Sequence, residues 1–392
     1  MREGWSYKRL GDVCTIERGG SPRPIDAFIT TEDKGLNWIK IGDAVEGSKY
    51  ISSTKEKIKP EGLKKTRFVH KGDFILSNSM SFGKPYILNI DGCIHDGWLV
   101  VHDENDTFDK SFLYYLLGSP NMYREFKRLA VGGVVNNLNS KVVRDVIVPV
   151  PPLQEQERIV AELDLLTGII DKQKQQLKEL DTLAQSIFYD MFGSVDNNTK
   201  NFMVKCLNEV FQLITDGTHQ TPQYTDDILH GFKFLSAKDV VSGVIDWTRI
   251  KYIPESLHNE LYKRLAPRRG DILLCKNGTT GICALVETDE VFDIYVSLAL
   301  LRTEKEYNKK YLVYAINNPS TKSQFDDSLK GVGVPNLHLG EIKKTKILVP
   351  PIELQSSFAK KIESIESQKQ SINRSIAESQ ILFDYTMDKY FG

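Results

Sequence analysis

Short polar and basic side chains recur in turn-rich segments of the chain, and their chemistry suits hydrogen bonding to nucleic acid. Arginine pairs well with guanine, asparagine and glutamine pair with adenine, and serine and threonine reach phosphate oxygens. The same residue types also build ordinary turns, so a purely structural role stays open. The segments span residues 18–23, 77–81 and 132–137 in the first half of the chain, and 215–220, 276–280 and 330–336 in the second.

From these segments and the residues beside them we select candidate DNA contacts in each half. Those in the first half are Arg18, Ser21, Arg23, Lys40, Ser77, Asn78, Ser79, Lys84, Asn136 and Asn137. Those in the second half are Thr215, Thr218, His219, Gln220, Lys238, Lys276, Asn277, Thr279, Thr280, Lys330 and Asn336. The two sets differ chemically although they follow one order along the chain. That difference is expected if two similar domains recognise two different DNA sequences.

Basic residues also concentrate at corresponding places in the two halves. Such clusters neutralise DNA phosphates, and they are equally compatible with a solvated protein face. The first cluster consists of Lys55, Lys57, Lys59, Lys64, Lys65, Arg67 and Lys71, and the second of Arg249, Lys251, Lys263, Arg264, Arg268 and Arg269.

Familiar catalytic and metal-binding motifs are absent from the sequence. It contains no G-x-x-x-x-G-K-[ST] phosphate loop, no G-x-G-x-x-G, no H-E-x-x-H and no G-x-S-x-G. The seven histidines lack metal-ligand spacing. The double proline at 151–152 lacks the Asp or Asn that adenine methyltransferases place before it. We therefore predict no catalytic residue, no metal site and no cofactor of this chain's own.

The elements that must position the candidate contacts are duplicated. Residues 35–43 match residues 231–239 at an offset of 196. The double prolines and the segments after them repeat at an offset of 199. An ordered series of such matches indicates two copies of one architecture. Each copy alternates β-rich runs with turns and holds one helical stretch, at 111–117 and 309–316. This pattern predicts a mixed α/β (α+β) fold with irregular sheets.

Each copy ends in about 40 residues with the period of a paired helix. Apolar side chains alternate at spacings of four and three from Ile159 to Met191, and the same phase runs from Phe358 to Tyr390. A period of 3.5 residues makes helices pair side by side. A double proline opens each segment and a glycine closes it, as helix termini prefer. At 1.5 Å per residue, each helix would be roughly 60 Å long.

We accordingly predict four parts, a globular domain at 1–152, a long helix at 153–193, a second globular domain at 194–351 and a second long helix at 352–392. The second domain links the end of the first helix to the start of the second. A globule of about 150 residues has a radius of gyration near 15 Å and does not bridge roughly 60 Å. The helices should therefore run antiparallel, with the chain termini close together. Polar seam residues Gln173 and Lys369 either fix the register or extend into solvent.

Bulk composition places few further limits on function. At 392 residues, with 41% hydrophobic and 26% charged residues, the chain suits a soluble protein of two or three domains. A net charge of −1 favours no particular partner. No apolar run is long enough for a signal peptide or a membrane span, and the five cysteines form no C-x-x-C pair. We expect a cytoplasmic protein with buried free thiols and no membrane contact.

Two junctions carry a family resemblance. Residues 148–156 are Val-Pro-Val-Pro-Pro-Leu-Gln-Glu-Gln, and residues 348–355 are Leu-Val-Pro-Pro-Ile-Glu-Leu-Gln. With the full-length duplication, the Gly-Asp elements at 72 and 270 and the Asn-Leu pairs at 137 and 336, they resemble the DNA specificity subunits of type I restriction-modification systems. The second junction departs from the first in one place, with Leu354 where the first has Glu155.

The resemblance implies two target-recognition domains, held apart by an antiparallel coiled coil, that each recognise one half of a bipartite site in double-stranded DNA. It also implies that two methyltransferase (modification) subunits and restriction subunits bind to this chain. S-adenosylmethionine and ATP are then expected only on those partners, and the specificity subunit performs no chemistry itself.

Two other functions stay open on the sequence alone. The first is a coiled-coil protein-protein scaffold whose globular domains recognise no DNA sequence. The second is a fragment of a methyltransferase–specificity fusion, which the two complete copies and the missing enzyme motifs disfavour.

Overall fold

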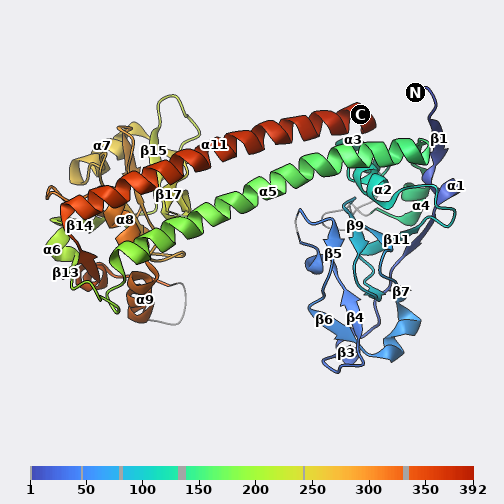
Figure 1. Cartoon of the computed structure of the whole chain (residues 1–392), viewed down its shortest axis with the longest axis horizontal. Coiled ribbons are helices and arrows are strands. Elements are labelled where there is room, and N and C mark those ends of the chain that lie inside the picture. Colours follow the sequence, from blue (N-terminus) through green and yellow to red (C-terminus); the bar gives the residue numbers. More distant parts are fainter. Residues whose placement is uncertain (1, 46, 79–82, 131–137, 242, 330–334) are drawn as a thin grey trace. The chain divides into compact units, whose positions relative to one another are not determined.

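The computed structural model describes residues 2–45, 47–78, 83–130, 138–241, 243–329 and 335–392, without the side chains of 129, 130 and 241. The chain forms two compact units (Figure 1). Unit 1 comprises Met1–Lys174 and Asn373–Gly392, and unit 2 comprises Gln175–Ile372. Each unit therefore contains one globular part and a portion of both long helices.

Unit 1 contains two five-stranded sheets and a two-stranded one. The first sheet has the order β2 (Thr15–Arg18), β11 (Trp98–His102), β8 (Phe74–Ser77), β9 (Pro85–Leu88) and β5 (Tyr50–Ile51). The second has the order β3 (Ile29–Thr30), β6 (Glu56–Ile58), β4 (Leu36–Ile39), β10 (Gly92–Ile94) and β7 (Arg67–Val69), and β1 (Ser6–Arg9) pairs with β12 (Ile147–Val150). The helices are α1 (Leu10–Val13), α2 (Lys110–Leu117), α3 (Pro120–Ala130) and α4 (Ser140–Asp145).

Unit 2 repeats this plan with fewer strands. One sheet has the order β14 (Leu213–Asp216), β22 (Leu298–Arg302), β19 (Ile272–Cys275) and β20 (Cys283–Leu285). A second has the order β18 (Lys251–Ile253), β15 (Phe232–Leu235) and β21 (Phe292–Ile294). Two further pairs are β13 (Met203–Cys206) with β23 (Lys346–Val349), and β16 (Val240–Val241) with β17 (Val244–Ile245). The helices are α6 (Leu207–Val210), α7 (Glu255–Arg264), α8 (Lys309–Asn317), α9 (Pro319–Ser328) and α10 (Leu339–Lys344).

The predicted duplication is confirmed by strand order and direction. In unit 1, β2, β11, β8 and β9 form an antiparallel series, and β14, β22, β19 and β20 do the same in unit 2. In both second sheets an antiparallel partner and a parallel partner flank one central strand, β4 or β15. The helical stretches predicted before a proline are α2 and α8. Sequence reasoning missed α3 and α9, each of which begins at that proline, where its missing N–H costs nothing.

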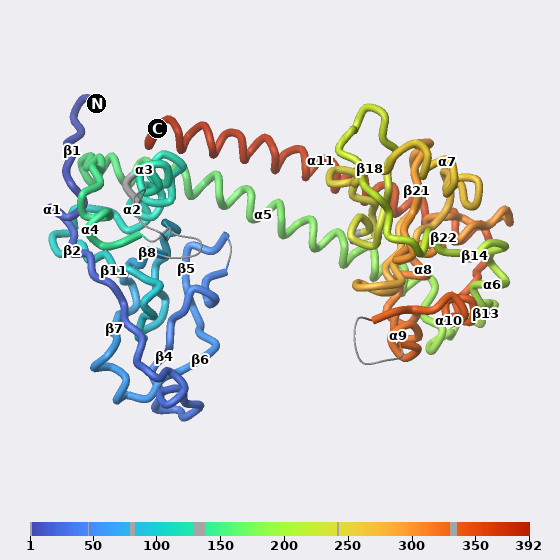
Figure 2. Tube along the Cα trace, turned by 180° about the vertical axis from the view of Figure 1, so that it is seen from behind, coloured from blue at the N-terminus to red at the C-terminus, as the bar shows by residue number. Residues whose placement is uncertain are grey.

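The two long helices are α5 (Leu153–Phe192) and α11 (Ile352–Phe391), each unbroken along its length (Figure 2). Every described seam position of the predicted pattern is buried or half-buried. In unit 1, Arg158 donates to the Tyr390 hydroxyl over 3.1 Å, and Gln173 donates to Ser375 over 2.7 Å. Residue numbers thus rise along one helix as they fall along the other. The paired segments of unit 1 are antiparallel, as predicted.

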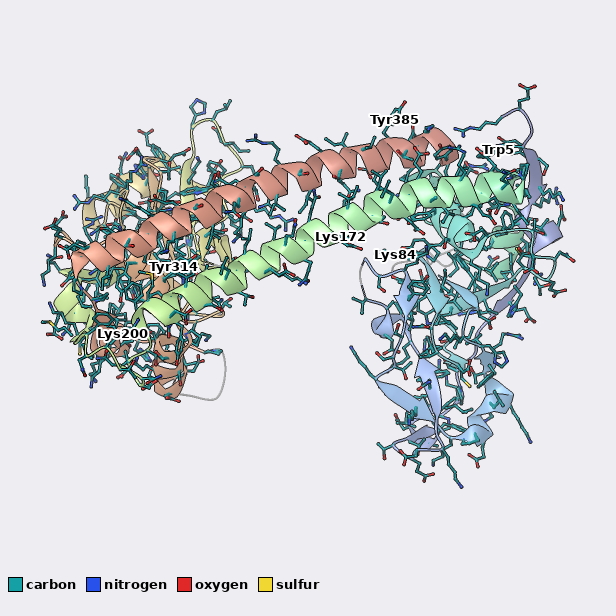
Figure 3. The ribbon with its side chains drawn as sticks, in the orientation of Figure 1. Trp5, Lys84, Lys172, Lys200, Tyr314 and Tyr385 are labelled. Atoms are coloured by element: carbon teal, nitrogen blue, oxygen red, sulfur yellow. The ribbon has the colours of Figure 1, made fainter. Side chains whose placement is uncertain are left out.

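The same direction holds in unit 2. Lys369 donates to Asp181 over 2.6 Å, and the rings of Phe192 and Phe358 lie 5.5 Å apart. Beyond the end of α5, Lys200 (labelled in Figure 3) donates to the carbonyl oxygen of Met191 over 2.9 Å, so the chain after the helix folds back as a cap on its terminus.

A buried glutamine fixes the start of each long helix. The Gln156 amide donates to the carbonyls of Thr107 and Pro151, both over 2.9 Å, and its oxygen accepts from the Asp109 N–H. The Gln355 amide donates to the Pro350 carbonyl over 2.8 Å and accepts from the Asn308 N–H. Because Asp109 and Asn308 are the N-caps of α2 and α8, this glutamine ties the double-proline junction to the globular core.

All five cysteines are free thiols, as predicted. Burial raises the pKa of Cys14 and Cys275 to about 12 and that of Cys93 to about 11. Cys206 is only half-buried, because its position at the N-cap of α6 lies near the surface.

Candidate nucleic-acid interface

Four candidate residues of unit 1 meet at one end of its first sheet, namely Arg18, Ser21, Ser77 and Asn78. Arg18 ends β2 and pairs with Leu99, while Ser77 ends β8 and pairs with Trp98. Since β11 lies between β2 and β8, Arg18 and the Ser77–Asn78 pair flank the first residues of that central strand. The fold therefore brings together segments that are 60 residues apart in the sequence.

Asp96, which sequence reasoning did not select, organises this end of the sheet. Its carboxylate accepts a hydrogen bond from the Ser21 hydroxyl over 2.8 Å and lies 3.0 Å from His95 Nε2. Its backbone carbonyl accepts from Arg18 Nε and from the Asn78 amide, each over 2.9 Å. Burial alone would raise the pKa of Asp96. The Ser21 hydrogen bond and the nearby cations outweigh it and hold that pKa below its ordinary value.

A cavity of about 580 Å³ opens beside this cluster. Lys40 and Glu56 form an ion pair of 2.5 Å in its wall, and exposed Arg23 lies 4.0 Å from Asp96. Burial lowers the pKa of His95, although Asp96 opposes that shift. The wall thus offers hydrogen-bond donors and acceptors. The lining residues are Ser21, Arg23, Ile25, Asp26, Ile29, Trp38, Lys40, Glu56 and His95.

Unit 2 builds the corresponding sheet end from different side chains. Asp216 ends β14 opposite Ala299, and Lys276 follows β19, so the two flank the start of β22. By strand register, Asp216 occupies the position of Arg18, and Lys276 that of Asn78. The backbone agrees, since Asn78 N–H donates to the Gly97 carbonyl and Lys276 N–H to the Ser297 carbonyl.

Asp216 and Lys276 form a buried ion pair, with side chains 9% and 7% exposed. His219 Nε2 lies 3.3 Å from the second oxygen of the same carboxylate, and Arg264 donates to the Asp216 carbonyl over 2.9 Å. Burial would raise the pKa of Asp216, but the hydrogen bond and charge of Lys276, followed by those of His219, hold it below its ordinary value. Asp216 is therefore a carboxylate with two partners.

The remaining candidates of unit 2 divide between the sheet end and the open surface. Asn277 and Asn336 form an antiparallel bridge, and Leu337 N–H donates to the Lys276 carbonyl, so Asn336 lies at this edge. Thr218 bridges to Tyr295 beside them. By exposure, Thr280 is buried, Thr215, Thr218, Asn277 and Asn336 are half-buried, and His219, Gln220, Lys238 and Thr279 are exposed.

Two candidates of unit 1, Ser77 and Asn78, are buried and help to hold the domain together. Ser77 is fully buried, and its hydroxyl accepts from the Lys84 N–H over 2.9 Å, which ties the end of β8 to the residue before β9. Asn78 is 1% exposed. The candidates Ser79, Asn136, Asn137 and Lys330 lie outside the described residues.

A glycine after the first strand of each sheet permits a close backbone crossing. A Cβ atom on Gly217 would lie 2.0 Å from the Ile294 carbonyl oxygen, and one on Gly19 would lie 2.4 Å from the His95 carbonyl oxygen. Ile294 ends β21 and His95 follows β10, so each glycine lies against the end of a strand of the second sheet. Only glycine allows this approach.

The two basic clusters are partly neutralised by local ion pairs. Arg67 pairs with Glu17 over 2.8 Å in unit 1, and Arg269 pairs with Asp289 over 3.0 Å in unit 2. Arg268 pairs with Glu304, and Lys251 lies 4.1 Å above the Tyr224 ring. Lys55, Lys64, Lys71, Arg249 and Lys263 are exposed. Exposed surface cations remain in both units, as binding to a polyanion requires.

Within the described ranges, no three His, Cys, Asp or Glu side chains are grouped as a metal site. None of the helices in that part of the chain is long and apolar enough to cross a membrane.

Comparison with known proteins decides the family. A model of the type I restriction modification DNA specificity domain matches residues 2–182 and 199–379. The chain belongs to this family. Each match covers one complete globular part, so both sheet ends described above lie in a DNA specificity domain.

Individual relatives are distant but span nearly the whole chain. The EcoBI specificity subunit of Escherichia coli is 22% identical over 404 residues, covering 96% of this chain and 82% of the relative. The MjaVIII specificity subunit of Methanocaldococcus jannaschii is 23% identical over 385 residues, covering 93% and 87%. These relatives share the specificity-subunit name.

Two solved structures share the fold of this DNA specificity chain. The S subunit of a type I system from M. genitalium matches with a TM-score of 0.51 at 14% identity, covering 99% of this chain and 96% of its own. A chain from a structure of the assembly and conformational transition of a type I restriction-modification system matches with a TM-score of 0.61 at 19% identity, covering 100% and 98%. The predicted fold class, two similar α/β domains with two long antiparallel helices, is confirmed.

Proposed function

We propose that this chain is the DNA-recognition subunit of a type I restriction-modification enzyme, with each globular domain recognising one half of a bipartite target. One observation carries the proposal. The same strand positions at the same sheet end hold Arg18 and Asn78 in unit 1 but Asp216 and Lys276 in unit 2. Two domains that recognise different DNA sequences need the same fold with different polar side chains at equivalent positions.

The helical pair sets the separation of the half-sites and binds the modification subunits. Heptad phase supports the second role in unit 1. Leu165 and Ile169 of α5 and Leu382 and Tyr385 of α11 lie on one flank of the antiparallel pair, at 64%, 38%, 52% and 67% exposure. Figure 3 labels Tyr385 on the side of α11 away from the unit 1 sheets.

The other flank of the same pair is already occupied. Val160 of α5 and Met387 of α11 pack against the unit 1 core. The apolar flank is thus available to a helix of a partner, and its contiguous exposed side chains are typical of an interaction surface.

The chain acts without chemistry of its own in this proposal. The modification subunits carry S-adenosylmethionine and methylate adenine, and the restriction subunits use ATP and cleave. The motif-free sequence supports this division of labour.

The test assembles the full chain with its modification subunits and selects methylated sequences from a random duplex pool. Arg23→Ala should relax one half of the selected site and Asn277→Ala the other half. Lys360→Ala, an exposed change on α11 away from that flank, serves as the matched control and should alter neither. If the wild-type complex selects no sequence, the chain is a protein-protein scaffold instead.

A further inference from the structure

Burying the ion pair between Asp216 and Lys276 at the sheet end costs free energy. Desolvating two charges costs several kcal/mol per ion, and an apolar pair of similar volume is commonly as stable. Both side chains are under 10% exposed. This cost suggests a role beyond stability, because Asp216 also contacts an exposed side chain.

That exposed side chain is His219, whose ring is 72% accessible to solvent. Nε2 lies 3.3 Å from Asp216 Oδ1, while Lys276 holds the other oxygen, Oδ2. An ionised carboxylate only accepts hydrogen bonds, so Nε2 carries the hydrogen. In the neutral imidazole, Nδ1 is then an acceptor.

The acceptor is kept available by its surroundings. Within the described residues, no recorded hydrogen bond involves His219 Nδ1, whereas the imidazole of His230 in the same unit uses its Nδ1 on Asp227 over 2.8 Å. The preceding residue, Thr218, bridges to Tyr295 at the sheet end, which holds the backbone beside His219. His219 therefore presents Nδ1 as a hydrogen-bond acceptor, on a ring whose Nε2 is held by Asp216.

We propose that His219 recognises one base pair of the unit 2 half-site by accepting a hydrogen bond from a base amino group in the major groove. Adenine N6 and cytosine N4 are the two amino donors there. Asp216 and Lys276 are positioning residues. Asp216 fixes the tautomer and orientation of the ring, and Lys276 keeps Asp216 ionised. This inference rests on the proposed function of the chain.

Lys276 is buried and paired with Asp216, so in this proposal it acts on the carboxylate rather than on a base. At the strand position of Asp216, unit 1 has Arg18, whose guanidinium only donates hydrogen bonds. Unit 1 therefore has no carboxylate at that position to orient an imidazole.

The experiment measures base preference at every position of the selected site, using the assembled complex and a random duplex pool at pH 8. His219→Ala should reduce preference at one base pair of one half-site by about tenfold, the lower range for a lost base contact, and leave the other half-site unchanged. The matched control His230→Ala changes another exposed imidazole of unit 2 and should alter no position.

The positioning role is tested with the charges removed together. Asp216→Leu with Lys276→Met removes the acceptor of the His219 Nε2–H and leaves no unpaired buried charge, and a thermal melt confirms that unit 2 still folds. The double variant should lose preference at the same single base pair as His219→Ala, and adding His219→Ala to it should change nothing further. A structural defect would instead weaken the whole half-site.

Replacing the base at that position with an analogue that lacks the amino group should weaken wild-type binding by the same factor as His219→Ala. The inference is overturned if His219→Ala leaves every preference intact, or if it weakens all sequences equally with a smaller salt dependence, as loss of a phosphate contact does. It is equally overturned if the double variant keeps full preference. Failure of the wild-type complex to select a bipartite site would instead refute the proposed function.

Discussion

Gln156→Ala is expected to destabilise unit 1 by about 3 kcal/mol. The side chain makes three hydrogen bonds, to Asp109 N–H and to the carbonyls of Thr107 and Pro151, and it is fully buried. Each such bond contributes about 1 kcal/mol net, and the bond to the Pro151 carbonyl is itself buried. Gln355→Ala removes two bonds from unit 2 and should cost about 2 kcal/mol there.

The assay is urea unfolding of the full chain followed by tryptophan fluorescence. In a Trp247→Phe background the remaining tryptophans, Trp5, Trp38 and Trp98, all report on unit 1. With a denaturant slope of about 1–3 kcal/mol per molar, Gln156→Ala should lower the unit 1 midpoint by about 1–3 M. Gln355→Ala should leave that midpoint in place, because Gln355 belongs to unit 2.

Gln154→Ala is the matched control, since Gln154 is an exposed glutamine on the same helical turn. Its effect should stay within about 0.5 kcal/mol. A Gln156→Ala midpoint no lower than that of Gln154→Ala would refute the role given to the junction glutamine.

Three further predictions follow from the geometry. Gly217→Ala forces a Cβ to within 2.0 Å of the Ile294 carbonyl and should destabilise unit 2 by more than about 2 kcal/mol in urea unfolding, whereas Gly340→Ala, which meets nothing within 4 Å on α10, should not destabilise it. The pKa of Asp96 is depressed in the folded state, so its ionisation stabilises unit 1 at neutral pH, and this contribution disappears as pH falls through the ordinary Asp range and below. Asp96→Asn should therefore flatten the loss of unit 1 stability on acidification from pH 7 to pH 3. Leu165→Ser with Tyr385→Ser should weaken binding of a modification subunit at least tenfold by titration without changing the selected bases, while Ser364→Ala on the corresponding polar position of α11 should do neither.

Patterns with a local physical cause were predictable from the sequence. The seam from Ile159 to Met191 follows from a 3.5-residue period, and the helix ends follow from proline and glycine. The duplicated strands could be located because Phe74–Ser77 and Ile272–Cys275 repeat in order. The antiparallel direction followed from chain length alone.

Features that depend on contacts between distant segments were not predictable. Asp96 lies in an ordinary Asp-Gly turn, and only the fold brings its carbonyl to Arg18 and Asn78. Asp216 was passed over inside a segment selected for its polar neighbours, because its partner Lys276 is 60 residues away. The sequence motif includes Gln156 and Gln355 but does not show what these glutamines do. In the structure their amides make buried hydrogen bonds that hold the junction. The exposed position of Leu354 makes no such bond, so Leu354 can replace Glu155 without consequence for the junction.

The buried pairing at the sheet end also constrains how such a domain changes its target. Replacing Asp216 alone leaves the Lys276 ammonium unpaired in a site that is 7% exposed, and breaking a buried pair from one side costs about 3–5 kcal/mol. A substitution at position 216 therefore needs a coordinated substitution at position 276, because Lys276 would otherwise stay buried without its partner. In unit 1 the same two positions, Arg18 and Asn78, are joined through the backbone carbonyl of Asp96, which neither substitution would remove. Single substitutions should therefore be tolerated at positions 18 and 78 far better than at 216 and 276, although the two pairs occupy equivalent places in the fold.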